Sequence, residues 1–381
     1  MKILALQSTS IFEQYGGVEY YLDDLLRSLG NLEGAENVAS LVPERNSFTR
    51  EPDGSYQVIP VPMTGRGWRR RFENRVPLLL FRQAFSLGRR MRPDLILCGH
   101  VSLGPLALLL SKLLGCRFVT VVYGIDAWGN LYPHDEWCLK QASALLSISH
   151  WTKQILVGRG YDEKRIHITH PVVAPDLTHE GRSATHRDPF TLLTVSRLDA
   201  SERYKGHDDT LQALAQLKSR GARFRYLIQG SGDDLERLEK RARDLGLTES
   251  VVFVGATHDR NELRALYSQA DVFIMPSRFG RWGNRWRGEG FGIVYAEAGA
   301  LGVPSIAYRC GGATDIIEHG KTGLLVEPNN IAELSHSILY CMDNPEVVQN
   351  LGENARKRVR SHFTRDQMKS SAEDFLRALR K

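Results

Sequence analysis

Two carboxylates lie close together in the segment Arg287-Gly-Glu-Gly-Phe-Gly-Ile-Val-Tyr-Ala-Glu-Ala298. We expect Glu289 at the N-terminus of a helix that begins at about Gly290, with Glu297 two turns further along the same helix. Such a pair can accept hydrogen bonds from the vicinal hydroxyls of a sugar ring or a ribose. The glycines between them expose backbone amides, and a helix N-terminus favours an anion. A helix-capping carboxylate and one solvated glutamate are the alternative interpretation.

Two cations follow a candidate strand in the same half of the chain. The strand expected over residues 191–195 leads into Arg197, and Lys205 stands a short distance further on. The carboxyl ends of parallel strands meet at one edge of a sheet, so we expect both cations near the acidic pair. They match the charge of a diphosphate, and each charge-assisted hydrogen bond contributes on the order of 1.5–3 kcal/mol. Salt bridges at the protein surface are the alternative.

A pair of glycines, Gly16-Gly17, precedes the first amphipathic segment. Two glycines before a helix allow the backbone to approach a phosphate or a sugar closely, although an ordinary turn is the alternative. No G-x-G-x-x-G follows any expected strand, which argues against a nicotinamide enzyme, and no G-x-x-x-x-G-K-[ST] occurs, which argues against a P-loop protein.

The elements that must position these residues alternate in two series. Strands are expected over residues 3–7, 38–42, 57–61, 94–98, 118–122 and 144–147, and again over 191–195, 225–229, 251–254, 271–275, 304–307 and 323–326. Apolar strands alternating with helices are typical of a parallel sheet covered on both faces. We therefore expect an α/β protein with two doubly wound, Rossmann-like domains, residues 1–175 and 176–364, with a cleft between them. The polar stretch 174–189 suits a linker, and residues 365–381 have helical spacing.

Composition narrows the class of protein. The 381 residues are 42% hydrophobic and 25% charged, which excludes a disordered chain. The net charge of +6 favours phosphates, anionic lipid or nucleic acid as partners. The five cysteines show no C-x-x-C spacing, so we expect reduced thiols and no metal site. No membrane span and no secretory leader are expected, and these features together predict a cytoplasmic protein.

These segments together resemble retaining glycosyltransferases of family four (glycosyl transferases group 1), which have the GT-B fold. The resemblance is clearest from about residue 190 to 330. Its most specific parts are the segment from Glu289 to Glu297, the pair Arg197 and Lys205, and Gly311-Gly312-Ala-Thr-Asp-Ile-Ile-Glu318 followed by Gly320-Lys-Thr-Gly-Leu-Leu325. It implies an N-terminal acceptor-binding domain, a C-terminal donor-binding domain, and a C-terminal helix that packs back on the N-terminal domain.

The resemblance also implies roles for individual residues. The catalytic set is Glu289, Arg197 and Lys205, in which Glu289 would hold hydroxyls of the donor sugar and the two cations would bind its diphosphate. Glu297 would hold the ribose, and Ile293 would pack on the nucleoside. The implied donor-binding residues are Gly16, Gly17, Gly255, Thr257, Gly290, Phe291, Gly292, Ile293 and Glu297.

Two features depart from the family pattern. Where the family often has His-Gly-x-Asp/Glu, this chain has Tyr123-Gly-Ile-Asp126, and a phenol is a poor base at neutral pH. This departure argues against an imidazole role at that position. The loop over residues 279–287 is longer and more basic than usual, so its tryptophans, Trp282 and Trp286, could stack on a sugar while its arginines meet an anionic acceptor or donor. A loop with no binding role is the alternative.

The expected acceptor-binding residues are Tyr123, Asp126, Trp68 and Arg69. The last two belong to a basic and aromatic segment, residues 65–75, that suits an anionic membrane bearing a lipid-linked sugar. A solvated basic loop is the alternative. The protein would then be cytoplasmic or peripheral at the inner face of a membrane.

The implied reaction moves a hexose from a UDP- or GDP-linked donor to a glycan, lipid-linked sugar or small molecule, in the biosynthesis of cell-surface polysaccharide or glycoconjugate. We expect it to need no cofactor and no metal, because two cations and a helix N-terminus supply positive charge and no Asp-x-Asp follows a strand. A sugar-nucleotide epimerase with the same fold is one alternative. A basic nucleic-acid-binding protein is the other, although no nucleic-acid-binding module is recognisable, so we expect no nucleic-acid partner.

Overall fold

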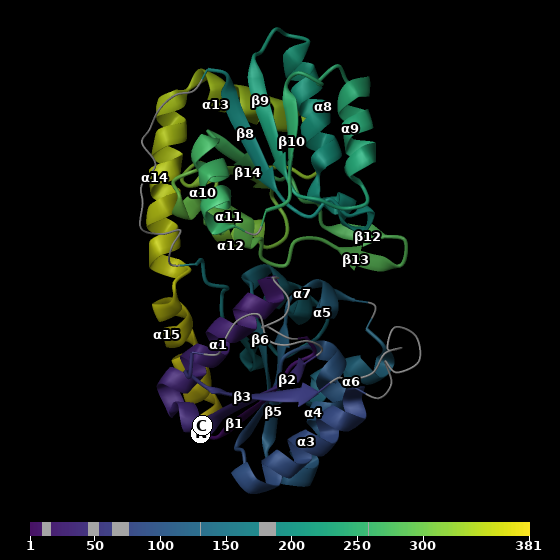
Figure 1. Ribbon diagram of the computed structural model, residues 1–381, viewed down its shortest axis with the longest axis vertical. Coiled ribbons are helices and arrows are strands. Elements are labelled where there is room, and N and C mark those ends of the chain that lie inside the picture. The colour runs from purple at the N-terminus through teal and green to yellow at the C-terminus, as the bar shows by residue number, and fades with distance from the viewer. Residues whose placement is uncertain (10–16, 45–52, 63–75, 130, 175–187, 258) are drawn as a thin grey trace. The chain divides into compact units, whose positions relative to one another are not determined.

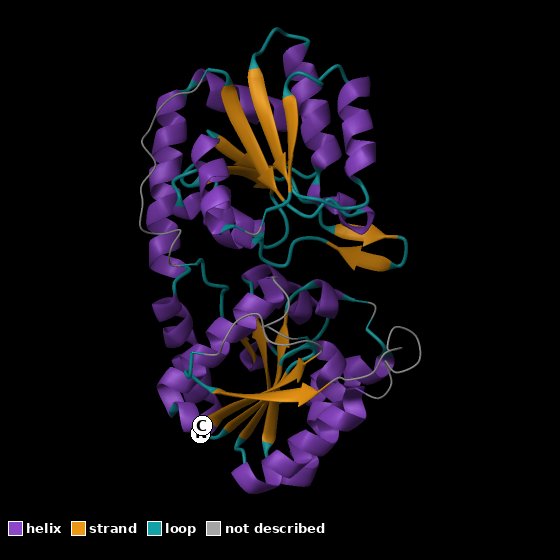
Figure 2. Cartoon of the chain, in the orientation of Figure 1, coloured by secondary structure: helices purple, strands orange, loops and turns teal. Residues whose placement is uncertain are grey.

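The computed structural model describes residues 1–9, 17–44, 53–62, 76–129, 131–174, 188–257 and 259–381 (Figure 1). They form two compact units, Met1–Val172 with Arg365–Lys381, and Val173–Thr364. Each unit is a parallel sheet with helices packed around it (Figure 2). The expectation of two doubly wound domains is confirmed, whereas the acceptor and donor roles of the two halves stay predictions.

The N-terminal unit contains a seven-stranded parallel sheet in the order β3-β2-β1-β4-β5-β6-β7. Its strands are β1 (Ile3–Leu6), β2 (Val38–Glu44), β3 (Gln57–Pro62), β4 (Leu95–Cys98), β5 (Arg117–Val122), β6 (Ala144–Ser147) and β7 (Ile166–Ile168). Its helices are α1 (Gly17–Glu33), α3 (Val76–Met91), α4 (Gly104–Leu114), α5 (Ile125–Trp128), α6 (Pro133–Gln141), α7 (His150–Gly158) and α15 (Arg365–Arg380).

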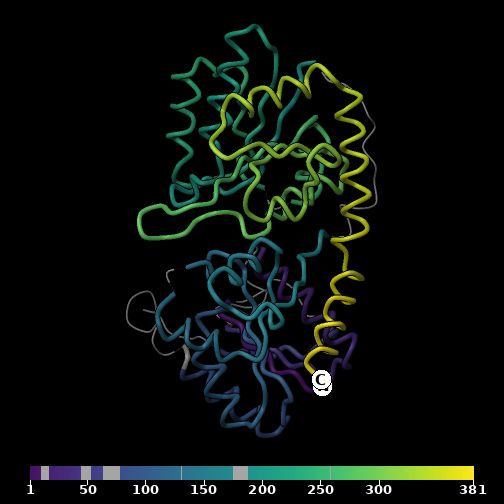
Figure 3. Tube along the Cα trace, turned by 180° about the vertical axis from the view of Figure 1, so that it is seen from behind, coloured from purple at the N-terminus to yellow at the C-terminus, as the bar shows by residue number. Residues whose placement is uncertain are grey.

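The core of this unit explains the apolar strands. Every residue of β1 is buried, as a strand covered on both faces requires. Leu4 and Ile96 of the sheet belong to one hydrophobic cluster with Leu80 of α3 and Leu110 of α4. The C-terminal helix α15 lies beside α1 in the same unit (Figure 3), where Arg365 Nε donates to Asp24 Oδ1 over 3.0 Å.

The C-terminal unit contains a six-stranded parallel sheet in the order β10-β9-β8-β11-β14-β15. Its strands are β8 (Phe190–Val195), β9 (Phe224–Gln229), β10 (Val251–Gly255), β11 (Val272–Ile274), β14 (Ser305–Tyr308) and β15 (Gly323–Val326). Its helices are α8 (His207–Lys218), α9 (Leu235–Asp244), α10 (Arg260–Gln269), α11 (Ile293–Ala300), α12 (Ala313–Ile316), α13 (Ile331–Asp343) and α14 (Pro345–His362). The strand order reverses between β8 and β11, the place where such sheets bind ligands.

Two local expectations were wrong. The segment expected to be a loop after β11 contains an antiparallel hairpin, β12 (Gly280–Trp282) and β13 (Arg285–Arg287). The helix expected at about Gly290 begins at Ile293, because Gly292 has a left-handed conformation (φ 84°) and forms its N-cap. Glu289 therefore lies in the loop before the helix rather than at its N-terminus.

Candidate active site

The candidate site lies where β8 and β11 end, at the reversal of strand order in the C-terminal unit. After β8 the chain passes Arg197 and forms a short 3-10 helix, Ala200–Lys205. Gly206 then turns the chain into α8 with a left-handed backbone (φ 81°), and a Cβ at this position would lie 2.1 Å from the carbonyl oxygen of Pro276. Only glycine fits this turn, so the turn fixes where Lys205 sits.

Glu202 holds both cations of the expected pair. Lys205 Nζ lies 2.7 Å from Glu202 Oε2, and Arg197 pairs with Oε1 of the same carboxylate. The side chains of Lys205 and Glu202 are 10% and 11% exposed, whereas that of Arg197 is 72% exposed. The structure thus brings Arg197 and Lys205 together, with the lysine largely buried and the arginine at the surface.

Glu289 joins this group from the loop after β11. Its carbonyl oxygen accepts a 2.8 Å hydrogen bond from the Gly312 amide. A Cβ at Gly312 would lie 2.2 Å from the Cα atom of Phe291, so the two segments touch backbone to backbone. Burial raises the pKa of Glu289. The positive charges of Lys205 and Arg197 oppose this rise, whereas the negative charge of Glu202 adds to it. These four charged groups therefore form one electrostatic unit.

Tyr204 connects this group of charged side chains to the hairpin. Its side chain is buried, and burial raises its pKa strongly, with further contributions from Glu289 and Glu202. The Tyr204 ring meets the ring of Trp282 edge to face, with centroids 6.4 Å apart. The phenol is therefore a neutral hydrogen-bonding group beside the charged side chains.

Glu297 projects from α11, where the sequence analysis expected it. Its Oε2 accepts a hydrogen bond of 3.2 Å from the buried Tyr267 hydroxyl. Ile293, at the start of the same helix, is half-buried. Phe291 is buried and packs edge to face on Phe363, so its side chain belongs to the core of this unit.

Gly255 and Thr257 lie at the carboxyl end of β10, two strands along the sheet from β8. Gly255 is exposed and has a left-handed backbone (φ 77°). The hydroxyl of Thr257 donates to Glu262, and its carbonyl oxygen accepts from Gln229. This pair therefore sits at the expected sheet edge, with the Thr257 hydroxyl engaged by a neighbouring carboxylate.

Tyr123 and Asp126 form a separate group at the end of β5 in the N-terminal unit. The Tyr123 hydroxyl donates to the Gly99 carbonyl over 3.0 Å, and its amide donates to Asp126 Oδ1 over 2.9 Å. Burial raises the pKa values of both side chains, and His100 opposes the rise at Asp126. His100 also stacks on the Tyr123 ring at 6.4 Å, an imidazole that the sequence analysis did not single out.

The other predicted residues of the N-terminal unit are partly described. Gly17 begins α1, is exposed, and has open space where a Cβ would be. Gly16, Trp68 and Arg69 lie outside the described residues. Their roles stay predictions.

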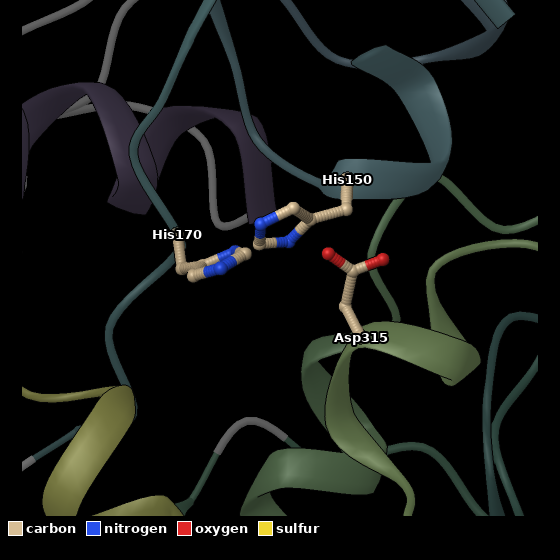
Figure 4. A group of neighbouring side chains, drawn as sticks. All are labelled: His150, His170 and Asp315. Carbon is tan, nitrogen blue, oxygen red and sulfur yellow. The ribbon is translucent and has the colours of Figure 1, made fainter. Parts of the chain in front are cut away.

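Two histidines of the N-terminal unit also lie together. The rings of His150 and His170 have centroids 5.3 Å apart, and His170 Nδ1 is 3.1 Å from the Ile148 carbonyl oxygen. Figure 4 shows the two imidazole rings, of which that of His150 comes from the start of α7. The pair within the N-terminal unit offers two metal ligands, fewer than the four of a structural zinc site.

Family models match both halves of the chain. The model described as Glycosyltransferase Family 4 matches residues 15–177, and the model described as Glycosyl transferases group 1 matches residues 178–358. The chain belongs to the family-four glycosyltransferases.

Curated relatives of this family-four glycosyltransferase act in several kinds of glycan synthesis. A GDP-mannose-dependent alpha-(1-6)-phosphatidylinositol monomannoside mannosyltransferase from Mycobacterium tuberculosis is 34% identical over 190 residues, which are 49% of this chain and 47% of the relative. The match thus spans about half the length of that relative. The amylovoran biosynthesis glycosyltransferase AmsK from Erwinia amylovora is 28% identical over 66% of this chain and 61% of its own.

Solved structures show that the fold is GT-B. HepE from Anabaena in complex with UDP superposes with a TM-score of 0.75 at 19% identity, covering 99% of this chain and 100% of that chain. The lipopolysaccharide outer core galactosyltransferase WaaB superposes with a TM-score of 0.77 at 20% identity, covering 100% of this chain and 99% of that chain.

Among the described helices of the glycosyltransferase, none has the length and apolar content needed to span a bilayer.

Glu202 and Tyr204 were not predicted from the sequence as members of the site. A signal for Glu202 was present, because it stands three residues before Lys205 and residues three apart eclipse each other on a 3-10 helix. Tyr204 carried no comparable signal, since its neighbours Glu289 and Trp282 are distant in sequence.

Proposed function

We propose that this glycosyltransferase is a retaining hexosyltransferase that uses a UDP- or GDP-linked sugar. The acceptor would be a glycan, a lipid-linked sugar or a small molecule, in the synthesis of cell-surface polysaccharide or glycoconjugate. The observation that carries the proposal is the grouping of Lys205, Arg197 and Glu289 around Glu202 at the end of β8. Two cations beside a carboxylate suit a ligand that has both phosphate and sugar hydroxyls.

The donor would bind in an extended manner along this edge of the sheet. Lys205 and Arg197 would contact the diphosphate, and Glu289 would accept hydrogen bonds from sugar hydroxyls. The amides that follow Glu289 precede the N-terminus of α11, where an anion is favoured. Glu297 and Ile293, further along α11, would contact the ribose and the nucleoside.

The chemistry follows from the charges. As the bond between the anomeric carbon and the phosphate oxygen breaks, negative charge grows on the diphosphate, and Lys205 and Arg197 stabilise it. The acceptor hydroxyl attacks the same face and passes its proton to the departing phosphate oxygen, so the configuration is retained. Because the two cations neutralise the leaving group, we propose that no metal ion is needed.

The acceptor would bind the N-terminal unit through Tyr123, Asp126, Trp68 and Arg69. The Tyr123 hydroxyl already donates to a backbone carbonyl, and its raised pKa keeps it protonated. A role in positioning the acceptor therefore suits it better than a role as a base. A lipid-linked acceptor would place the enzyme at the inner face of a membrane, and the name of one relative contains a lipid-linked sugar, phosphatidylinositol monomannoside.

The test is a screen of UDP- and GDP-sugars for release of UDP or GDP, with and without a chelator. We expect one donor to be turned over, with the same rate when EDTA is present. Loss of turnover with EDTA and its restoration by Mg²⁺ would contradict the metal-free mechanism. Conversion of the donor to an epimer without nucleotide release would identify an epimerase instead, and binding of no nucleotide sugar would reject the proposed function.

A further inference from the structure

The hairpin formed by β12 and β13 is a separate feature beside the candidate site. It projects from the C-terminal unit (Figures 1 and 2). Gly283 and Asn284 form its two-residue turn, in which Gly283 has a positive φ of 58° that an ordinary side chain would disfavour. The turn fixes the register, and the register decides which side chains share a face.

Residues paired across the hairpin lie on the same face. Arg281 is paired with Trp286. The ring of Trp286 stacks on that of Phe279, with centroids 5.0 Å apart, so the aromatic surface on this face is already in contact with another ring. Trp282 is paired with Arg285, and Gly280 is paired with Arg287. We refer to Trp282, Arg285 and Arg287 as the Trp282 face.

The Trp282 face borders the candidate active site. Trp282 contacts Tyr204 edge to face, and Arg287 acts electrostatically on the same phenol. Glu289 and Arg197 act on Tyr204 as well, so the hairpin face and the charged group share one neighbour. Trp282 is 37% exposed, and its ring lies over Gly280, where a Cβ would come within 3.4 Å of it. A flat aromatic surface is thus partly open beside the site.

The arginines of the hairpin are unpaired in the part of the chain that the structure describes. No carboxylate there lies within salt-bridge distance of Arg281, Arg285 or Arg287, although other arginines of this unit, such as Arg237 and Arg278, have acidic partners. An unpaired guanidinium next to an aromatic ring suits a ligand with a carboxylate or phosphate and an apolar face. The diphosphate of the donor already has Lys205 and Arg197 as partners.

We propose that the Trp282 face binds an anionic saccharide unit of the acceptor, in addition to the contacts proposed above for the N-terminal unit. The sugar ring stacks on Trp282, and Arg285 and Arg287 bind its carboxylate or phosphate group. This inference rests on the proposed function and adds the chemical class of the acceptor. The hairpin then selects charged over neutral acceptors while Glu289 and Lys205 act on the donor.

The experiment compares charged and neutral probes by NMR titration of the full chain. Methyl β-D-glucuronide is compared with methyl β-D-glucoside, and glucose 6-phosphate with glucose, so that the two arms separate a carboxylate from a phosphate. We expect one charged probe to bind about fivefold or more tightly than its neutral partner. Arg285→Gln should abolish this preference, whereas Arg281→Gln, which removes the same charge from the opposite face, should keep it.

Trp282→Ala provides a second arm, because loss of stacking should weaken the charged and neutral probes alike. Equal loss with Arg281→Gln and Arg285→Gln, or no preference in the unmodified chain, would overturn the proposal. Binding to vesicles of anionic lipid that depends on Arg285, without saccharide binding, would overturn it in favour of a membrane surface. UDP and GDP titrations of Arg281→Gln, Arg285→Gln and Trp282→Ala separate this failure from failure of the proposed function, since none of the three substitutions should change nucleotide affinity.

Discussion

Lys205 and Glu202 form a largely buried ion pair, with 2.7 Å between Nζ and Oε2, and Arg197 pairs with the other oxygen of that carboxylate. A diphosphate bound by the two cations must share them with Glu202 or displace it. Glu202 therefore has two opposing effects on a donor. It orients the lysine, and it repels the incoming negative charge.

Glu202→Gln should separate these two effects. The substitution removes a negative charge beside the diphosphate, so we expect UDP or GDP to bind about twofold to tenfold more tightly. Turnover should fall, because Lys205 loses the partner that orients it. Calorimetric titration at two salt concentrations measures the first effect, and Glu346→Gln, an exposed glutamate on α14, is the charge-matched control. Weaker nucleotide binding would show that orientation dominates over repulsion.

Glu289→Gln should raise the stability of the folded protein and lower its turnover. Burial raises the pKa of Glu289, so the ionised carboxylate lowers the stability of the folded protein above that pKa. We expect the glutamine variant to have a higher Tm than the wild type at pH 8 and a turnover reduced about tenfold or more. The Tm difference should shrink as the pH falls through the raised pKa of Glu289. It should vanish below the ordinary pKa of about 4.5, where Glu289 is protonated in both the folded and the unfolded chain. A Tm difference independent of pH would contradict this account.

His207 should make the protein sensitive to acid. It is buried, its Nε2 lies 2.9 Å from Ser196 Oγ, and burial together with Lys205 lowers its pKa to about 4. The unfolded chain takes up the proton first, so stability is lost as the pH falls from about 6.5 towards 4, by up to about 3 kcal/mol. Thermal unfolding at pH 7 and pH 5 measures the loss, which should be smaller in His207→Gln. An equal loss in both proteins would assign the acid sensitivity to other groups.

The contact between Gly312 and the Glu289 loop should tolerate no side chain. A Cβ at Gly312 would lie 2.6 Å from the Gly290 carbonyl oxygen, and backbone cannot move aside as a flexible side chain does. We expect Gly312→Ala to lower turnover about tenfold or more by displacing Glu289. Gly158→Ala is the control, since open space surrounds that position. Normal turnover in Gly312→Ala would show that the position of Glu289 is not critical.

The sequence predicted most strands because they are buried on both faces, and a continuous apolar run marks such strands whatever surrounds them. It did not predict β7, a three-residue edge strand with too few residues for a pattern. It also did not predict the hairpin, in which arginine, glycine and tryptophan alternate without a buried face. A local signal was present in the two-residue turn Gly283-Asn284, but the flanking residues lack the apolar alternation that marks a strand.

The sequence predicted those site residues that follow the ends of neighbouring strands in the chain. Arg197 and Lys205 follow β8 and Glu289 follows β11, and the two strands are neighbours in the sheet. The different burial of the two cations was not predictable, since it depends on Gly206 and on the loop that meets Pro276. The start of α11 was misplaced because Gly290 and Gly292 are equally permissive in sequence, and only packing selects the second as the N-cap.

The most direct test of the central claim is the affinity of one nucleotide diphosphate sugar for the wild type, for Lys205→Ala and for Lys369→Ala. Lys369 is an exposed lysine on α15 and controls for the loss of one positive charge. We expect a UDP- or GDP-sugar to bind the wild type and Lys369→Ala equally, and Lys205→Ala about tenfold or more weakly. Equal affinity for all three proteins would contradict the claim that Lys205 binds the donor diphosphate.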